Sequence, residues 1–546
     1  MSRNVVALGV AISAWGLAGV ALAQQTAPAP DERDARIDRL ENEVRALVDA
    51  NRSEAVQIAA LTAQIADLKT SREPAQQAQV ETLPAPPPRG PPAAIASLAD
   101  GKPVIATPDG RFSLTVHGIA QLDAAAYDQA SAGPIATDLR RSGPALGASA
   151  SNVDLSHARQ LRDGDVFRRA RIGIDGTAFG DFDYRLIFDF GGTGVENAGQ
   201  VYETWIQYSG FHPAKLRVGA FPPSIGLEDQ GSTSTMPLLE RSAVSDIARG
   251  FVAGDTRTAV EAFANGPHWL ISGAVTGRTI GVINTGTAAA TPQTFGDQLG
   301  LVGRLAATPL HGDDWLVHFG VHGSYLVTPP DASGPPTAGA SPLSREVVAF
   351  ADTPELRVDG TKLINTGNIS ARHADEEGLE FAAQKGSLFL QSEYEHFDVD
   401  RATPGVSNPR FHGWYVEGSW IVTGESRKYN TQTAAFDGPA VPHPFSPRDG
   451  GWGAWEVALR YADTDLNYDA GAPGTAAAAD AIRGGELKVI SAGINWYLNP
   501  IMRIMLDFQH VMLDRLSPNG TLYSTPTGAQ IGQDYNVVSV RSQVAF

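Results

Sequence analysis

Residues 167–190, FRRARIGIDGTAFGDFDYRLIFDF, alternate charged and apolar side chains on both sides of a short Gly-Asp turn. Because successive side chains of a strand point to opposite faces, the pattern predicts a hairpin with one apolar and one charged face. The apolar face of the first run contains Val166, Ala170, Ile172, Ile174 and Ala178. Phe182 and Phe190 end the apolar face of the second run, which is typical of a membrane barrel strand, with a surface hairpin of a soluble sheet as the alternative.

The start of the chain predicts export. Arg3 precedes an apolar stretch at 5–20, and the tripeptide Ala-Leu-Ala at 21–23 forms a small-x-small cleavage site. We interpret residues 1–23 as a signal peptide, with a membrane anchor as the alternative. No later stretch approaches the ~20 consecutive apolar residues that a spanning helix needs, so insertion into a membrane would use strands. The chain contains no cysteine, which excludes a disulfide framework.

Residues 31–73 show a different periodicity. Apolar residues from Ile37 to Leu68 follow a 3-4 spacing, which predicts the a and d positions of a short oligomeric coiled coil, with a lone amphipathic helix as the alternative. Asn51 falls at an a position, where one polar residue often determines register. Residues 74–110, which include APPPRGPP, are predicted to form a semi-rigid linker.

Within residues 111–546, the segments of alternating apolar and polar residues are joined by connections that are short and long by turns. Short turns such as FGDF at 179–182 alternate with long polar stretches such as 326–376. Outer-membrane barrels have short periplasmic turns and long external loops. Counting the connections, with 423–451 as an unusually long periplasmic one, predicts an all-β, sixteen-stranded antiparallel transmembrane β-barrel preceded by an N-terminal coiled-coil helix. A soluble β-sandwich array is the alternative.

The segment YNVVSVRSQVAF predicts the last strand and its register. One face, expected to meet lipid, carries Val538, Val540, Val544 and Phe546. The other face, expected to meet the lumen, carries Ser539, Arg541 and Gln543. Phe546 on the lipid-facing register is the usual ending of such barrels.

Four blocks of sequence on different predicted strands carry a family resemblance. They are FRRARIGIDGTAFGDFDYRLIFDF, KLRVGAFPPSIGLED, WYVEGSWIVTGESRKY and GAWEVALRYADTDL. In this order they resemble the phosphate-selective porins O and P over most of the chain from about residue 111. The resemblance implies a trimeric sixteen-stranded outer-membrane channel, a third external loop folded inward as a constriction, and anion passage helped by inward-pointing basic residues. It also implies that the connection 423–451 folds into the lumen.

The strand register places many basic residues on the lumen face. They are Arg169, Arg171, Arg185, Lys215, Arg217, Arg304, Arg460, Arg503 and Arg541. Fixed guanidinium groups attract anions and can hold phosphate through paired hydrogen bonds. Acidic residues share the same face, however, so the arginines could instead pair with them across strands. A pore for phosphate and other anions and a general small-solute pore without phosphate preference both remain open.

The third loop, at 221–256, is where the bore is expected to narrow. Its charged residues include Glu228, Asp229, Glu240, Arg241 and Arg249. Arg241 and Arg249 are candidate constriction cations, and bracing of the loop against the wall is the alternative. Conduction needs binding weak enough to release the solute, so several moderate sites would serve better than one tight site.

The sequence contains few motifs that are typical of enzymes. We therefore predict that the protein is not an enzyme and has no cofactor and no metal site. His318 and His322 share one face of a strand, but no carboxylate stands nearby at ligand spacing, which favours plain lumen histidines. An outer-membrane hydrolase is the alternative from another class. The net charge of −18 argues against a nucleic-acid partner. The expected partners are small anionic or hydrophilic solutes, outer-membrane lipid, two further copies of the chain and, through the periplasmic coil, the cell wall.

Overall fold

The computed structural model describes residues 94–99, 101–129, 161–192, 199–254, 257–280, 298–330, 346–517 and 528–546, together with Arg45. The chain divides into two compact units, Met1–Gly90 and Pro91–Phe546. The predicted signal peptide lies outside the described residues, and so does the predicted coiled coil except for the helical Arg45. None of the helices among the described residues has both the length and the apolar character required to cross a membrane.

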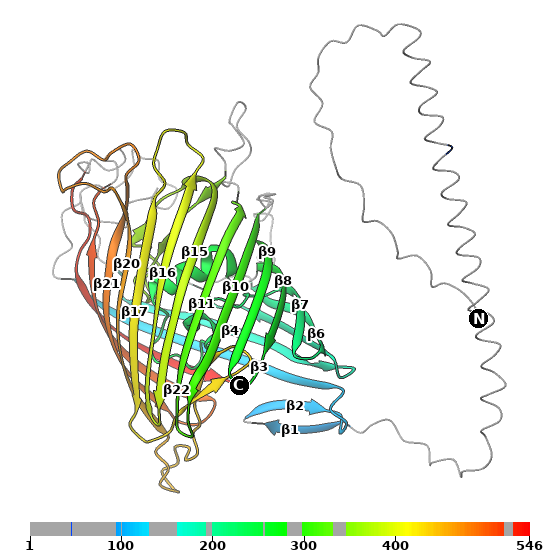
Figure 1. The fold of residues 1–546 in the computed structure, drawn as a ribbon. Coiled ribbons are helices and arrows are strands. Elements are labelled where there is room, and N and C mark those ends of the chain that lie inside the picture. The colour runs from blue at the N-terminus through cyan, green and yellow to red at the C-terminus, as the bar shows by residue number, and fades with distance from the viewer. Residues whose placement is uncertain are drawn as a thin grey trace, which may run out of the picture. The chain divides into compact units, whose positions relative to one another are not determined.

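Sixteen antiparallel strands form a closed barrel, which confirms the predicted fold (Figure 1). Closure comes from β23, which pairs with β3 from Tyr535↔Gln129 to Ala545↔Ile119. The strands are β3 (Ser113–Gln129), β4 (Gly164–Ala178), β5 (Phe182–Asp189), β6 (Gln200–Phe211), β7 (Ala214–Ala220), β8 (Arg257–Asn265), β9 (Trp269–Thr279), β10 (Leu299–His311), β11 (Trp315–Thr328), β15 (Ile369–Lys385), β16 (Leu388–Arg401), β17 (Arg410–Ile421), β20 (Ala454–Tyr468), β21 (Ile482–Tyr497), β22 (Met502–Asp514) and β23 (Tyr535–Ala545).

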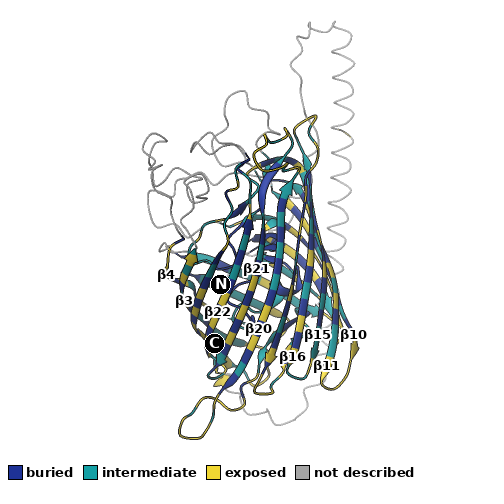
Figure 2. Cartoon of the chain, turned by 90° about the vertical axis from the view of Figure 1, so that its left-hand side faces the viewer, coloured by how far each residue is buried: buried dark blue, intermediate teal, exposed yellow. Residues whose placement is uncertain are grey.

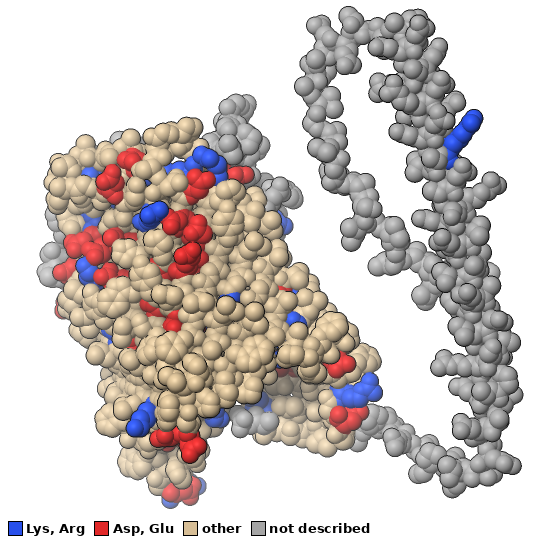
Figure 3. Space-filling view, viewed as in Figure 1, with Lys and Arg blue, Asp and Glu red and all other residues tan. Residues whose placement is uncertain are grey.

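Buried and exposed residues alternate along the strands (Figure 2). In β9, Leu270, Ser272 and Ala274 are buried whereas Ile271 and Val275 are exposed. The exposed positions are largely apolar, and Figure 3 shows a broad surface with few charges between the two ends of the barrel. Buried positions therefore face the inside, where they are covered by protein, and exposed apolar positions form the outer belt that a lipid-facing barrel requires.

The register predicted for the last strand agrees with this arrangement. Val538, Val540 and Val544 are exposed on β23, and Ser539, Arg541 and Gln543 are buried. Apolar residues on the outer face and polar residues on the inner face are the arrangement that the sequence pattern predicted.

The first strand of the opening hairpin departs from simple alternation. The pairing of β3 with β4 shifts between Gln121↔Arg169 and Leu122↔Phe167, which leaves Arg168 as the extra residue of a β-bulge. Phe167 is therefore exposed and Val166 is buried. The prediction that Val166 shares the apolar outer face with Ile172 is wrong, because one extra residue reverses the facing of every position beyond it.

A hairpin precedes the barrel where the sequence predicted only linker. Strands β1 (Ile95–Ala99) and β2 (Lys102–Ala106) pair with each other, and β2 pairs with the start of β3. Gly101, at φ 81°, occupies the tight turn between β1 and β2. The prediction of linker for the whole of 74–110 is therefore corrected at 95–106, where β-branched residues such as Val104 and Ile105 suit a strand.

Short and long connections alternate at the two ends, as predicted. Strand β4 connects to β5 through residues 179–181, and β15 connects to β16 through 386–387. The exception at the short-turn end is the connection 422–453, which was predicted as an unusually long one. It carries the inner hairpin of β18 (Arg427–Asn430) and β19 (Ala435–Pro439).

Two long loops supply much of the material inside the barrel. The third loop, between β7 and β8, carries α2 (Leu227–Gln230), α3 (Ala243–Ala248) and the π-helix η5 (Arg249–Ala253), and the fifth loop, between β11 and β15, carries β12 (Val347–Val348), β13 (Ala351–Asp352) and β14 (Ile364–Asn365). Val244 and Phe350 from these loops pack with Phe397, Phe411 and Val537 of the wall in one buried cluster. The apolar core thus lies within the barrel and holds both loops in place.

Candidate pore constriction and lumen wall

Side chains of the wall bind the backbone of the third loop. The Arg503 guanidinium donates to the carbonyls of Ser234 and Met236, and Asn495 Nδ2 donates to the Pro237 carbonyl at 2.7 Å. Gln543 Nε2 donates to Ser234 as well, at 2.8 Å. Carbonyls of an irregular segment need donors when they are buried, so these contacts fix the path of the loop across the lumen.

The loop continues into a short helix whose start is determined locally. Ser242 is the N-cap of α3, and its hydroxyl accepts a hydrogen bond from the backbone N–H of Ser245. Gly254, at φ 35°, follows the end of η5. Asp246 and Arg249 are thus carried by a short helical segment with defined ends, whereas Glu240 and Arg241 directly precede its N-cap.

Glu240 joins the third loop to three arginines of the wall. Arg168 Nε and Nη2 donate to its two carboxylate oxygens at 2.9 and 3.0 Å, and Arg169 and Arg541 contact the same carboxylate. Burial opposes ionisation of Glu240, but the three guanidinium groups hold its pKa well below the usual range. Arg541 also binds both oxygens of Asp123, at 2.6 and 2.7 Å.

Glu228 joins the loop to a fourth wall arginine. Arg460 Nη1 lies 2.9 Å from Glu228 Oε1 and 3.2 Å from Glu417 Oε2, and its Nη2 lies 2.6 Å from Glu355 Oε2 of the fifth loop. Ser242 donates to Glu228 from both its backbone N–H and its hydroxyl. One arginine therefore connects the wall with both inward-folded loops.

Arg241 and Arg249 are held within the third loop itself. Arg241 Nε donates to the Glu228 carbonyl, and its guanidinium lies 3.5 Å from Asp229 and 3.9 Å from Asp246. Arg249 pairs with Asp229. The two arginine side chains are 6% and 13% exposed. These contacts favour the bracing alternative, while the charge of both arginines still balances two carboxylates at this point of the lumen.

Several other predicted lumen cations are completely buried. Arg169, Arg304, Arg460, Arg503 and Arg541 are each no more than 2% exposed. Arg304 binds both oxygens of Glu380, at 2.8 and 2.7 Å, and donates to the carbonyls of Thr433 and Ala434 in the connection between β18 and β19. That connection therefore folds into the lumen, as the family resemblance implied, and these five arginines act first as structural ties.

The remaining predicted cations lie on β4 to β7. Arg171 binds Asp189 at 2.7 Å and its guanidinium lies 3.4 Å from the centre of the Tyr202 ring. Arg185 is 34% exposed and Arg217 is 24% exposed. Among the basic residues predicted for the lumen face, the more accessible charges thus belong to this part of the wall.

Aromatic rings and carboxylates surround the accessible cations. The Trp205 ring centre lies 5.4 Å from the Arg185 guanidinium and 4.6 Å from that of Arg217, and the Phe263 ring centre lies 5.5 Å from Lys215 Nζ. Arg185 is 3.3 Å from Glu203 and 3.5 Å from Asp175, and Arg217 is 3.5 Å from Glu261. Arg217 also donates two hydrogen bonds to Gln207 Oε1, at 3.1 and 2.9 Å. The longer N···O distances leave the carboxylates weakly paired with both guanidinium groups, so a passing anion can replace a carboxylate.

Sequence reasoning missed several residues of this arrangement. Arg168 was not assigned to the lumen because the bulge could not be seen, although two adjacent arginines in FRR are a signal for one. Arg357, which pairs with Asp246 and Asp352, and Arg427, which binds Glu456 at 2.6 Å, lie in connections between strands of the barrel wall. No strand pattern could have assigned them.

The two strand histidines have carboxylate neighbours, contrary to the prediction. His318 Nε2 lies 3.0 Å from Glu380, and His322 contacts Glu376, Glu380 and Glu395. The prediction searched for carboxylates along the same strand, whereas these glutamates come from the neighbouring strand β15 and from β16, the next strand beyond it. Their arrangement is taken up below.

Comparison with known proteins identifies relatives of the chain. The family model for the phosphate-selective porins O and P matches residues 146–546. Porin O of Pseudomonas aeruginosa is 26% identical over 366 residues, which cover 65% of this chain and 78% of that protein. Solved structures with a similar course include an anion-selective porin from Comamonas acidovorans, with 14% identity, a TM-score of 0.45 and coverage of 80% of this chain and 100% of that one. The outer-membrane channel DcaP of Acinetobacter baumannii has 11% identity and a TM-score of 0.42, and the match covers 81% of this chain and 99% of that one.

Proposed function

Because the chain belongs to the family of phosphate-selective porins O and P, we propose that it is an outer-membrane porin through which small hydrophilic solutes diffuse passively, anions including phosphate among them. The family and the barrel fold indicate a channel rather than an enzyme. The observation that carries the anion preference is the group of accessible, weakly paired cations Arg185, Lys215 and Arg217 on the inner wall. An anion that passes these cations can displace their carboxylate partners, whereas the buried arginines are held in ion pairs and hydrogen bonds within the protein.

Reversal potentials of the reconstituted channel in a KCl gradient test this proposal. We expect the wild-type channel to prefer chloride over potassium modestly and phosphate to reduce the chloride current. Replacing Arg185 and Arg217 by Gln should move the reversal potential toward cation preference and weaken the phosphate effect, because Glu203, Asp175 and Glu261 would lose their counter-charges. A wild-type channel that prefers cations and is not blocked by phosphate would instead support the general pore.

Arg410→Gln is the matched control for this experiment. Arg410 is paired with Asp398 and its side chain is 71% exposed. It lies next to the inward-facing Phe411 on β17 and so faces outward. Removal of one positive charge at this position should leave selectivity unchanged.

We further propose that Glu228, Asp229, Glu240, Arg241 and Arg249 form the constriction. Replacing both Arg241 and Arg249 by Gln should shift the reversal potential toward cations, because Asp229 would then face the narrowed bore without a counter-charge. A fixed charge at a narrow, poorly screened point acts on every passing ion, since screening in solution extends over only ~8 Å. An unchanged reversal potential would place the ion path away from these residues.

The finer organisation is also part of the proposal. The family supports a homotrimer in the outer membrane, and the heptad pattern of 31–73 supports a periplasmic coiled coil behind a signal peptide at 1–23. Such a coil could contact the cell wall. Analytical ultracentrifugation of the detergent-solubilised chain tests the trimer, and the mass of a monomer at all concentrations would contradict it. Sedimentation with purified peptidoglycan tests the cell-wall contact. A protein that fails to co-sediment would contradict that contact.

A further inference from the structure

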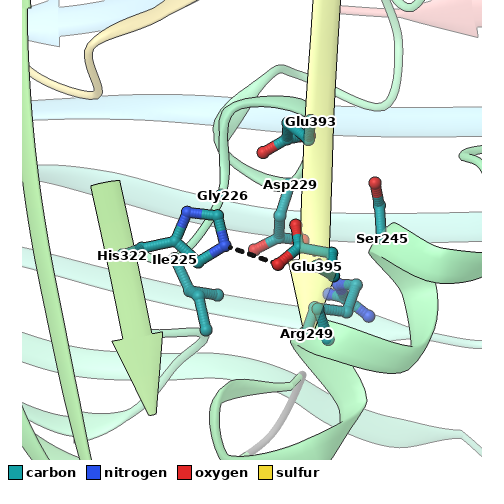
Figure 4. A pocket seen from close by; sticks show the side chains of 9 residues that line it. Ile225, Gly226, Asp229, Ser245, Arg249, His322, Glu393 and Glu395 are labelled. Atoms are coloured by element: carbon teal, nitrogen blue, oxygen red, sulfur yellow. Dashed lines mark hydrogen bonds and ion pairs between the residues drawn. The ribbon is translucent and has the colours of Figure 1, made fainter. Parts of the chain in front are cut away.

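A histidine and four glutamates lie together behind the third loop. His322 belongs to β11, Glu376 and Glu380 to β15, and Glu393 and Glu395 to β16, and all five are buried. Figure 4 shows His322 and Glu395 pointing toward each other below Glu393.

His322 on β11 and Glu395 on β16 can approach each other because the strand between them, β15, has a glycine at that position. His322 is the register partner of Gly378, and Gly378 is the register partner of Glu395. A Cβ atom at 378 would collide with both His322 Nε2 and Glu395 Oε2, so the absent side chain leaves the space in which these two groups meet.

The four carboxylates of this cluster outnumber the basic side chains that pair with them. Arg304 binds both oxygens of Glu380. In the part of the chain that the structure describes, Glu376, Glu393 and Glu395 form no ion pair with arginine or lysine. Buried carboxylates without a counter-charge are costly, so either protons or a cation must compensate them.

The imidazole of His322 is oriented as a metal ligand would be. Its Nδ1 lies 2.9 Å from Glu380 Oε1, and its Nε2 lies 3.0 Å from Glu395 Oε2 and 3.2 Å from Glu376 Oε1. A neutral imidazole carries one N–H. When Nδ1 donates that hydrogen to Glu380, Nε2 directs a lone pair toward two carboxylate oxygens, and metal-binding histidines are commonly held by a carboxylate in this way.

Glu376 supplies an independent observation. Its Oε2 accepts a hydrogen bond from the Ser324 hydroxyl at 2.7 Å, whereas its Oε1 has no hydrogen-bond partner among the residues that the structure describes, although Glu376 is only 1% exposed. The unpartnered Oε1 is directed at His322 Nε2. Ligand distances of about 2.1 Å place neighbouring ligand atoms about 3.0 to 3.4 Å apart, and the two separations from Nε2 fall in that range.

We propose that His322 Nε2, Glu376 Oε1 and Glu395 Oε2 bind a divalent first-row transition ion, of which Zn²⁺ is the representative. One imidazole and two carboxylates suit such an ion, whereas Mg²⁺ and Ca²⁺ prefer oxygen ligands alone. The three side chains can bring ligand atoms within 4.8 Å of one another. Beside His322 and Glu395 lies a cavity of about 10 Å³, which has room for about one water molecule as a further ligand.

The third loop forms the other side of this cavity. Ile225 and Gly226 line it, and so do Asp229 and Arg249, which pair with each other. An ion at this point would therefore connect β11, β15 and β16 immediately behind the constriction and stabilise the packing of the loop against them.

Zinc titration of the full-length, chelator-treated protein in detergent tests the proposal. We expect one Zn²⁺ per chain by calorimetry and elemental analysis, and an increase in the unfolding temperature of the barrel with added Zn²⁺. His322→Gln and Glu395→Gln should each weaken binding by at least about tenfold and remove the temperature increase, because loss of a ligand should cost no less than loss of its outer partner. His396→Gln is the control, since His396 follows Glu395 on β16, points to the opposite face and pairs with Asp398.

Two outcomes would overturn the site. Wild-type protein that binds no Zn²⁺ would mean that protons compensate the cluster, with His322 as an imidazolium. Equal binding by wild type, His322→Gln and Glu395→Gln would place the ion elsewhere. Should the His322 variant fail to fold, Glu376→Gln replaces it in the test, and this variant should also weaken Zn²⁺ binding. The glutamine side-chain carbonyl at position 376 can still accept the Ser324 hydrogen bond. None of these measurements involves conduction, so the metal site and the solute preference succeed or fail separately.

Discussion

Glu240→Gln is expected to destabilise the barrel by about 3 kcal/mol, because Arg168, Arg169 and Arg541 would lose their shared buried carboxylate. The isosteric amide keeps the shape of the side chain but removes the charge that the three guanidinium groups surround. Equilibrium unfolding in urea, followed by tryptophan fluorescence in detergent, measures the loss. The same change should loosen the third loop and raise the single-channel conductance.

Glu377→Gln is the matched control for Glu240→Gln. Glu377 is an exposed residue of β15 that lies between the inward-facing Glu376 and Gly378. Its neutralisation should change the free energy of unfolding by no more than about 0.5 kcal/mol. Similar values for both variants would show that Glu240 does not fasten the loop.

Leu459→Arg is expected to cost about 2 to 4 kcal/mol of barrel stability. Leu459 is 60% exposed on β20, between the buried Ala458 and Arg460. Its place near the middle of that strand puts a new charge close to the middle of the hydrocarbon layer, where arginine is most unfavourable. Folding titrations into lipid vesicles measure this difference directly.

Val422→Arg provides the comparison for Leu459→Arg. Val422 is 43% exposed and follows the end of β17 at the short-turn end of the barrel. Near the interface the cost of arginine falls to about 0 to 1 kcal/mol. Equal costs at both positions would contradict the lipid-facing assignment, because that assignment places them at different depths in the membrane.

The sequence determined the strands, their number and most of their facing. Because one face of each strand meets lipid and the other meets polar groups, apolar and polar residues alternate at nearly every strand position. The local pattern is therefore sufficient to assign Val540 to the outer face and Arg541 to the inner face. Connection lengths then determined the order of the strands. The bulge at Arg168 escaped this reasoning, because an extra residue is identified by what its neighbours pair with.

Only the tertiary structure decided what the inward-facing charges do. A register identifies Arg460 and Arg185 equally as lumen residues, yet Arg460 is buried among Glu228, Glu355 and Glu417 while Arg185 keeps a third of its side chain exposed. The partners of Arg460 come from two loops and another strand, far apart in the chain. Strand facing depends on a period of two residues, whereas the pairing of a charge depends on where distant loops pack inside the barrel, and no local pattern encodes that.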